Sequence, residues 1–337
     1  MKLTAPNQLA ACLRDYFMDH LPRLRGLSPN TVLSYRDSLV LLLRFLARER
    51  KREACDLDLD DIDPDQVLSF LNHLEQDRHN GVPTRNVRLA AIHAFFRYVG
   101  ARHPDQLERA QRILAVPFKR GQQRAVEYLE QDEIEAILSR IERASQAGRR
   151  DYVLLATMFN TGARVQEMIN LRACDLQLTH PYQLRLLGKG RKERFCPLWS
   201  QTAQVLRELC EERGLDLRSE TRVFLNQRGG PLTRFGVRYI LAKWLDRTRP
   251  EVATLAQKRL HPHSIRHSTA VALLKSGVDL STISQWLGHS CPSTTNRYAT
   301  IDLEMKRQAI DKVKPIPGSG KAPWRKDQTV LEWLENL

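Results

Sequence analysis

Residues 183–198 read QLRLLGKGRKERFCPL, the pattern of a β-hairpin inside an otherwise helical half of the chain. Two short apolar runs flank a basic turn that holds glycines at positions 188 and 190. Apolar residues at helical spacing predict helices around it, over 130–145, 151–160, 164–171, 200–213, 232–246, 264–276 and 279–287. The second half is therefore predicted to be mixed α+β and mainly helical.

The first 115 residues carry helical patterns throughout. Ser28-Pro29 and Asp63-Pro64 each place a capping side chain before a proline at the first helical position. Further helices are predicted over Asn7–His20 and from Pro83 onward. These patterns predict a small all-α bundle.

The chain is thus predicted to be multidomain. The segments are a helical domain over 1–115, a basic linker over 116–126, a mixed domain over 127–313 and a C-terminal tether with a short helix over 314–337. The final helix is amphipathic, so it can pack on its own chain or dock on a neighbouring subunit.

Charge and composition narrow the class of protein. The 337 residues include 53 Lys and Arg against 39 Asp and Glu, a formal net charge of +14. No apolar run approaches the ~20 residues of a membrane span, and no signal peptide is expected. The 6 cysteines form no CxxC pair, which fits a cytoplasmic protein. A basic protein of this kind favours a nucleic-acid partner, although a basic surface can also serve solubility alone.

Four places carry polar residues suited to phosphate chemistry. Arg164 follows a glycine at the start of a predicted helix, and Lys189 lies in the hairpin turn. His263 and Arg266 are three apart and share a helix face, where a guanidinium can bind two phosphate oxygens while an imidazole moves a proton. His289 and Tyr298 follow the last predicted helix. Each residue alone has an ordinary alternative: a surface arginine, a solvated turn, a structural histidine or a packing tyrosine.

The order of these residues resembles the tyrosine recombinase (phage integrase-type) family, notably its Xer-type members. Residues 161–171, 188–198, 263–279 and 287–298 are similar to the conserved segments of that family. The resemblance covers nearly the whole chain. It implies a SAM-like core-binding N-terminal domain and a catalytic domain that together clamp duplex DNA.

The resemblance implies roles for the residues at the family's catalytic positions. Tyr298 is the nucleophile that forms a 3′-phosphotyrosyl bond, and Arg164 and Arg266 bind the scissile phosphate. Lys189 is the general acid for the leaving 5′ oxygen, with Lys192 as the alternative lysine in the same turn.

The remaining positions of the resemblance assist this chemistry. His263 helps to remove the proton of Tyr298, whose ordinary pKa near 10 makes it a weak nucleophile at neutral pH. His289 hydrogen-bonds the phosphate, and Glu167 orients the cluster. No metal, ATP or other cofactor is expected.

Basic side chains outside the catalytic set are assigned to DNA binding: Arg85, Arg88, Lys119, Arg120, Arg124, Arg191, Lys192 and Arg234. The expected partner is double-stranded DNA with inverted-repeat core sites. The resemblance implies a homodimer on each site, a tetramer in synapsis and association with the nucleoid during the reaction, and it leaves open whether a partner recombinase is needed.

Several alternatives stay open at this point. A metal hydrolase could use His261, His263, His267 and His289, although no glutamate lies between the middle pair. A type IB topoisomerase shares the chemistry, and a catalytically silent relative could act as an architectural DNA-binding protein. Among recombinases, integration, excision or transposition of a mobile element is the first expectation, and Xer-type resolution of chromosome or plasmid dimers is the second.

Overall fold

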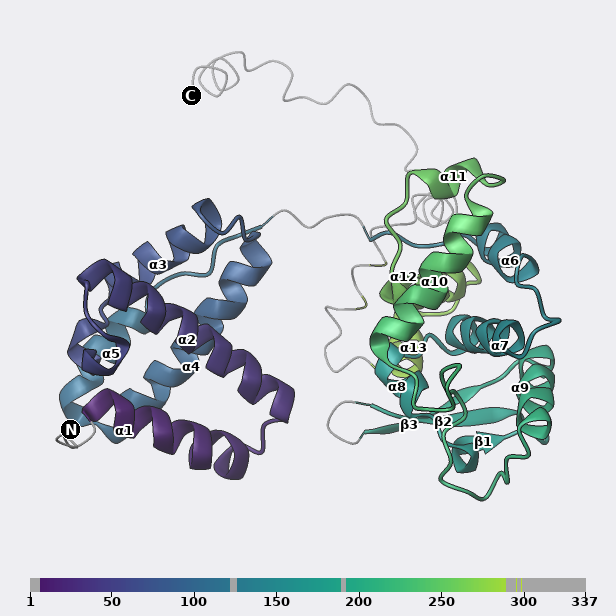
Figure 1. The fold of residues 1–337 in the computed structure, drawn as a ribbon, viewed down its shortest axis with the longest axis horizontal. Helices are drawn as coiled ribbons and strands as arrows, with labels where there is room; N and C mark the ends of the chain where they lie inside the picture. Colours follow the sequence, from purple (N-terminus) through teal and green to yellow (C-terminus); the bar gives the residue numbers. More distant parts are fainter. Residues whose placement is uncertain (1–6, 122–125, 189–191, 289–294, 296–297, 299–337) are drawn as a thin grey trace, which may run out of the picture. The chain divides into compact units, whose positions relative to one another are not determined.

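The computed structural model describes residues 7–121, 126–188, 192–288, 295 and 298. The chain divides into two compact units, Met1–Gln123 and Arg124–Leu337, and each is described by itself (Figure 1). The division falls inside the stretch 116–126 that the sequence marks as a linker. The predicted tether and helix over 314–337 lie outside the described residues.

The first unit is a helical bundle. Its helices are α1 (Gln8–Asp15), the π-helical continuation η1 (Tyr16–Leu24), α2 (Pro29–Arg50), α3 (Pro64–Gln76), α4 (Val82–Arg102) and α5 (Leu107–Leu114), with short 3₁₀ turns η2 (Ala54–Asp56), η3 (Leu59–Asp61) and η4 (Pro104–Gln106). Ser28 caps α2, and Asp63 caps α3 by accepting a hydrogen bond from Gln66 N at 2.8 Å. The predicted helix starts at these caps are confirmed, whereas α5 was not predicted.

The second unit combines helices with a small sheet. Its elements are α6 (Gln131–Ser139), α7 (Gln146–Thr161), α8 (Val165–Asn170), η5 (Ala173–Asp175), β1 (Leu176–Gln177), β2 (Gln183–Leu187), β3 (Glu193–Pro197), α9 (Ser200–Glu212), α10 (Arg234–Thr248), α11 (Ala253–Ala256), α12 (Pro262–Lys275) and α13 (Leu280–Leu287). The strands form an antiparallel sheet in the order β1-β2-β3, beside α8 and α9 (Figure 1). The predicted hairpin is confirmed, while β1 and α11 were not predicted.

The register of the hairpin decides which side chains of β3 face inward. Leu184 pairs with Cys196 and Leu186 pairs with Arg194, and these positions point to the inner face of the sheet. Arg194 is therefore an inward-facing cation on a strand whose other inward position, Cys196, is fully buried. Such a charge requires a partner inside the protein.

Buried carboxylates link distant helices of this unit. Asp151 on α7 is buried and accepts a 2.9 Å hydrogen bond from Trp244 Nε1 on α10. Glu133 on α6 is buried and binds Lys258 and Thr254. These contacts fix the helices that surround α12. Over the described residues, no helix combines the length and apolarity that a membrane crossing needs.

Candidate active site

Gly162 ends α7 and brings Arg164 to the start of α8. Gly162 has a left-handed φ of 60°, and a Cβ atom there would lie 2.5 Å from Leu287 Cδ2. Both observations require glycine, because other residues rarely adopt this conformation and no space exists for a side chain. The tight turn lets α7 end against α13 and places Arg164 beside the end of that helix.

Glu167 holds Arg164 in place from one turn further along α8. Its carboxylate accepts hydrogen bonds from Arg164 N at 2.7 Å and from Arg164 Nη1 at 2.9 Å. The residue is only 5% exposed. Burial alone would raise the pKa of this carboxyl, but hydrogen bonds and positive charge from Arg194 and Arg164 lower the pKa below its ordinary value. Glu167 is therefore an anion at neutral pH.

Arg194 on β3 is the second cation bound to Glu167. Its Nη1 and Nη2 atoms donate to the two carboxylate oxygens, each at 2.8 Å. Burial alone would lower the pKa of Arg194, yet the hydrogen bonds and charge of Glu167 raise it above the ordinary value. The sequence analysis assigned this residue no role. The only local indication was a charged residue at an inward position of the predicted strand.

The C-terminal end of α13 gathers three arginines. Helix ends leave carbonyl groups without helical partners, and here three consecutive carbonyls accept from three guanidinium groups. The pairs are Arg194 Nε with Trp286 O at 2.9 Å, Arg266 Nη2 with Leu287 O, and Arg164 Nη2 with Gly288 O at 3.1 Å. The negative end of the helix dipole thus favours the same cations. Side chains from α8, β3 and α12 meet at this one point.

Arg266 is the most buried member of this arginine cluster. It is 2% exposed, and its Nη1 donates to Gly162 O at 2.6 Å. Burial, followed by the charges of Arg164 and Arg194, lowers its pKa to about 9, so the side chain is still a cation at neutral pH. Three guanidinium groups face one carboxylate here. An anion bound at the cluster would offset the excess positive charge, which is the electrostatic condition for a phosphate site.

His263 lies on the first turn of α12, one helical turn before Arg266. Its ring is 6.3 Å from that of His261 and 6.2 Å from that of His267, so the ring is partly shielded although the residue as a whole is exposed. This shielding, followed by the positive charge of Arg266, lowers the pKa of His263. A neutral imidazole at physiological pH can accept a proton.

Tyr298 is buried against α12 and α13. It is 1% exposed and packs with Ala270, Leu274 and Leu287 among the apolar residues of these helices. Its hydroxyl is hydrogen-bonded to His267 Nδ1 at 2.8 Å. The sequence analysis expected His263 to act on this tyrosine and considered His267 only as a metal ligand. The structure instead places His267 at the hydroxyl.

Comparison with known proteins identifies the family. The phage integrase family matches residues 127–305, and the phage integrase N-terminal SAM-like domain matches residues 15–103. The chain belongs to the phage integrase family. It is a tyrosine recombinase, an enzyme that transfers DNA strands, with the predicted SAM-like and catalytic domains. This family assignment favours strand transfer over the metal-hydrolase alternative.

Relatives of this recombinase extend over its whole length. It is 36% identical to the integrase/recombinase y4rC of Sinorhizobium fredii, covering 99% of this chain and 100% of that protein. It is 31% identical to tyrosine recombinase XerC of Pelobacter propionicus, covering 89% and 94% of the two chains. Among solved structures, XerH bound to a palindromic difH substrate matches with a TM-score of 0.69 at 22% identity, covering 91% of this chain and 90% of that one. The Tn1549 transposon integrase in complex with circular intermediate DNA matches with a TM-score of 0.68 at 17% identity, over 91% and 100%.

Several predicted site residues lie outside the described part of the recombinase. These are Lys189, Arg191, His289 and Arg124. The hairpin can be followed up to its turn, where Gly188 N donates to Lys192 O at 2.8 Å. Lys192 itself is exposed.

The structure argues against the predicted DNA contact of Arg85. This residue is buried, and its Nη1 donates to Pro117 O at 3.1 Å. Arg88 is half-buried and donates to Ser38 Oγ at 3.0 Å, so it links α4 to α2. Both guanidinium groups thus hydrogen-bond within the first unit, Arg85 to the chain after α5 and Arg88 to α2. A pattern of basic residues in the sequence does not distinguish this structural role from DNA binding.

The other described members of the DNA-binding set are exposed. Lys119 forms an ion pair with Glu75 at 3.1 Å, and Arg120 follows it on the surface. Arg234 Nε donates to Gln166 Oε1 at 2.6 Å at the start of α10. These side chains are accessible to a phosphate backbone, so their assignment stays a prediction.

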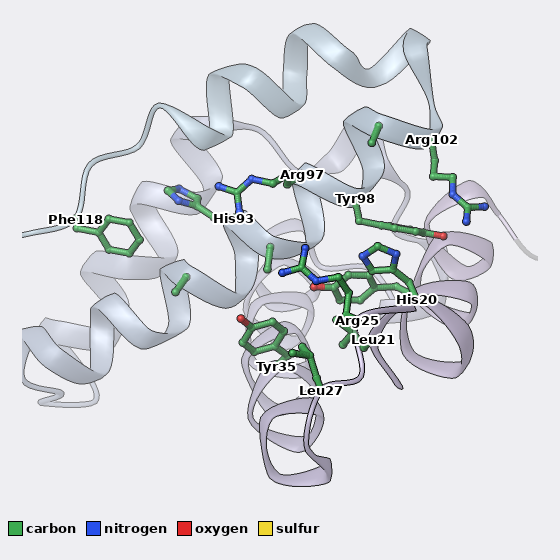
Figure 2. Close-up of a pocket in the computed structure, with 14 residues that line it drawn as sticks. His20, Leu21, Arg25, Leu27, Tyr35, His93, Arg97, Tyr98, Arg102 and Phe118 are labelled. Atoms are coloured by element: carbon green, nitrogen blue, oxygen red, sulfur yellow. The ribbon is translucent and has the colours of Figure 1, made fainter. Parts of the chain in front are cut away.

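A basic hollow in the first unit was not predicted. It has a volume of about 510 Å³ and lies between η1, α2 and α4, where Figure 2 shows Arg25, Arg97 and Tyr35. Arg102 also lines it, and none of the described lining residues is acidic. Its residues come from four separate parts of the sequence, so no local motif reveals it.

Proposed function

We propose that this recombinase cuts and rejoins duplex DNA through a 3′-phosphotyrosyl bond at Tyr298, during integration, excision or transposition of a mobile element. The observation that carries the proposal is the arginine cluster at the end of α13. Arg164 and Arg266 come from segments about 100 residues apart and converge on consecutive carbonyls. With Glu167 as the shared counter-ion, the cluster keeps an excess of positive charge for one phosphate group.

The proposed reaction conserves the energy of the phosphodiester. Tyr298 Oη bonds to phosphorus while the bond from phosphorus to the 5′ oxygen breaks. The phenol proton passes to a base, and the 5′ oxygen takes a proton from an acid, so a free 5′-hydroxyl leaves. A 5′-hydroxyl of another strand then attacks the phosphotyrosine in the reverse sense and restores both the phosphodiester and the phenol.

Proton transfer in this scheme is assigned to two residues, and a third binds the phosphate. His263 suits the base, because its lowered pKa keeps the ring neutral at physiological pH. Lys189 is assigned as the acid for the 5′ oxygen, and His289 as a hydrogen-bond donor to the phosphate. The last two assignments rest on the family resemblance.

Tyr298 must leave its buried position before it can attack. Its hydroxyl is held by His267, and its ring packs among apolar side chains of α12 and α13. We therefore infer that the structure represents a resting arrangement and that DNA binding accompanies release of the tyrosine. His267 then acts as the holding partner of the hydroxyl.

Duplex DNA is the proposed ligand of the basic hollow in the first unit as well. Arg25, Arg97 and Arg102 supply the positive charge of the hollow. His20 contributes none at neutral pH, because burial and the charges of Arg25 and Arg102 lower its pKa. The aromatic ring of Tyr35 adds an apolar wall. In this proposal the hollow replaces the predicted contact of Arg85 with DNA.

The assembly is proposed to be a dimer on inverted-repeat core sites and a tetramer in synapsis. Two structural neighbours support the dimer: XerH was crystallised on a palindromic substrate, and a lambda integrase dimer was crystallised on a core site. The tetramer rests on the family resemblance. The C-terminal segment 314–337 is proposed to dock on a neighbouring subunit. Recombination by the purified protein alone would show that it needs no partner recombinase.

The test is covalent trapping on nicked duplexes. A pool of nicked duplexes of random sequence is incubated with the protein, and SDS-resistant complexes are recovered and sequenced. We expect an adduct with the wild type, none with Tyr298→Phe, and an unchanged amount with Tyr182→Phe, a matched control in the same unit. Absence of any wild-type adduct would favour a silent architectural protein and refute the proposal.

Dimer resolution is the second candidate function, supported by the XerC relatives. The sequenced adduct sites separate the two roles. Sites at the ends of a mobile element support the first proposal, whereas one chromosomal or plasmid site that joins dimers supports the second. Supercoil relaxation without joining of two sites would indicate a topoisomerase-like enzyme.

A further inference from the structure

We propose that Arg194 is a positioning residue that holds strand β3 of the hairpin against α8 and the end of α13, and that it thereby positions the proposed acid Lys189. Lys189 lies outside the described residues, and its part in the proposal rests on its place five residues before Arg194 in the sequence. This inference rests on the proposed function. Arg194 is 11% exposed in its side chain and belongs to β3, the strand that follows the hairpin turn. Its side chain contacts α8 and the end of α13, the two other elements beside the proposed catalytic residues.

The guanidinium of Arg194 joins three elements with three of its nitrogen atoms. Nη1 and Nη2 bind the Glu167 carboxylate of α8, and Nε donates to Trp286 O at the end of α13. Glu167 also has its own bonds to Arg164 N and Nη1 at the start of α8, so Arg164 keeps this support when the bonds from β3 are weakened. The planar fork of arginine suits this arrangement, whereas the single ammonium of lysine cannot bind both carboxylate oxygens and the carbonyl in the same geometry.

Two glycines leave room for Arg194 and its partner. A Cβ atom on Gly288 would lie 3.2 Å from Arg194 Cδ, and one on Gly188 would lie 3.3 Å from Glu167 Oε1. Gly188 directly precedes Lys189, and Gly288 directly precedes His289. The Arg194–Glu167 pair therefore packs against the two glycines that immediately precede the proposed catalytic residues in the sequence.

This placement separates Arg194 from the residues that bind phosphate. Its donors are committed to Glu167 and Trp286, so its proposed effect passes through the position of Lys189. A misplacement of about 1 Å far from the reacting atoms can cost ~100-fold in rate. The defect should then be largest for a leaving group that depends on the acid. An alkoxide oxygen depends on it strongly, whereas a thiolate, whose acid has a pKa of ~8.5, leaves without a proton.

The test compares two leaving groups on the duplex recovered by covalent trapping. One substrate has the natural 5′ oxygen at the scissile phosphate, and the other has sulfur in its place. For Arg194→Lys we expect adduct formation at saturating protein to fall ~100-fold on the oxygen substrate and less than ~10-fold on the sulfur substrate, with duplex affinity unchanged. The matched control is Arg185→Lys, whose exposed side chain on β2 pairs with Asp175, and it should behave as wild type on both substrates.

Two further measurements keep the outcome decisive. In a Lys189→Ala background, Arg194→Lys should cause no further loss on the oxygen substrate, because the residue it positions is already absent. If Arg194→Lys does not fold, Gly188→Ala crowds the same pair from the backbone side and should show the same selective loss.

The outcomes distinguish this inference from the function on which it rests. A wild type that forms no adduct on any duplex overturns the proposed function. A wild type that forms adducts, combined with an equal loss on oxygen and sulfur substrates, overturns the role of Arg194 and leaves the function standing. The role of Arg194 would also be overturned if the losses in rate caused by Lys189→Ala and Arg194→Lys multiply in the double variant.

Discussion

Replacing Glu167 by glutamine removes the negative charge that Arg164 and Arg194 share. The Arg194 side chain is 11% exposed, so its charge would be left buried without its counter-ion. Breaking a buried pair from one side costs about 3–5 kcal/mol. Arg164 is more exposed and adds little, and the amide oxygen of glutamine still accepts a hydrogen bond. We therefore expect a loss near the lower limit, about 3 kcal/mol in the free energy of unfolding.

Tryptophan fluorescence isolates this effect, because all 5 tryptophans lie after residue 124 and hence report the second unit alone. Urea titration of the full chain should show the loss as a lower midpoint. For a unit of this size, about 3 kcal/mol corresponds to a fall in melting temperature of ~6–12 °C. Glu135→Gln on α6 is the matched control, since Glu135 is exposed, and it should change stability by less than ~0.5 kcal/mol.

The effect should depend on pH in a defined direction. The pKa of Glu167 is lowered in the folded protein, so its stabilising contribution is complete above the ordinary glutamate pKa of ~4.3. The contribution is lost as the pH falls through the lower pKa of the folded state. The stability gap between wild type and Glu167→Gln should therefore narrow below about pH 4. A gap under ~1 kcal/mol at pH 7, or one that widens in acid, would refute the ion-pair reasoning.

Three further predictions concern other parts of the molecule. Trp244→Phe leaves the buried Asp151 carboxylate without its indole donor and should lower stability by ~1–3 kcal/mol, measured by circular dichroism in urea; no change would contradict a structural role of that bond. Arg97→Ala should weaken duplex binding and make the log–log salt slope less steep by ~0.9 if it neutralises one phosphate, and an unchanged slope would remove the hollow from the DNA grip. His267→Phe removes the hydrogen bond that holds the Tyr298 hydroxyl and should speed adduct formation ~2–10-fold, whereas slower formation would make His267 part of the chemistry.

Local patterns in the sequence predicted the elements that depend on local contacts. The caps at Ser28 and Asp63 and the hairpin over 183–198 each arise from residues within one turn or one strand pair. Helix α5 also carries a local pattern, with Leu107, Ala110, Ile113 and Leu114 at helical spacing, but the helix is only eight residues long and was not predicted. Short amphipathic segments of this kind are easily passed over when longer helices stand beside them.

The assignment of DNA-binding arginines shows a second limit. Helix α4 buries apolar residues around much of its circumference, including Leu89, Phe95 and Tyr98, so the sequence leaves its outward face undefined. Arg88 and Arg97 are nine residues apart, which places them about half a turn from each other around the axis. The sequence analysis assigned Arg88 to DNA binding, but this residue hydrogen-bonds to α2 within the bundle. Arg97, on the opposite side of α4, lines the hollow.

The arginine cluster explains how segments that are far apart in the sequence form one site. The last carbonyls of α13 have no partners within the helix, and a left-handed Gly288 with a φ of 63° ends the helix there. Arginines from α8, β3 and α12 satisfy those carbonyls, so the same bonds that complete the helix also set the distances among the guanidinium groups. The bond from Arg194 to Trp286 spans 92 residues and carries no local pattern. A residue that binds phosphate can be recognised by its resemblance to a family, whereas a residue that positions others is found only where the chain has folded around it.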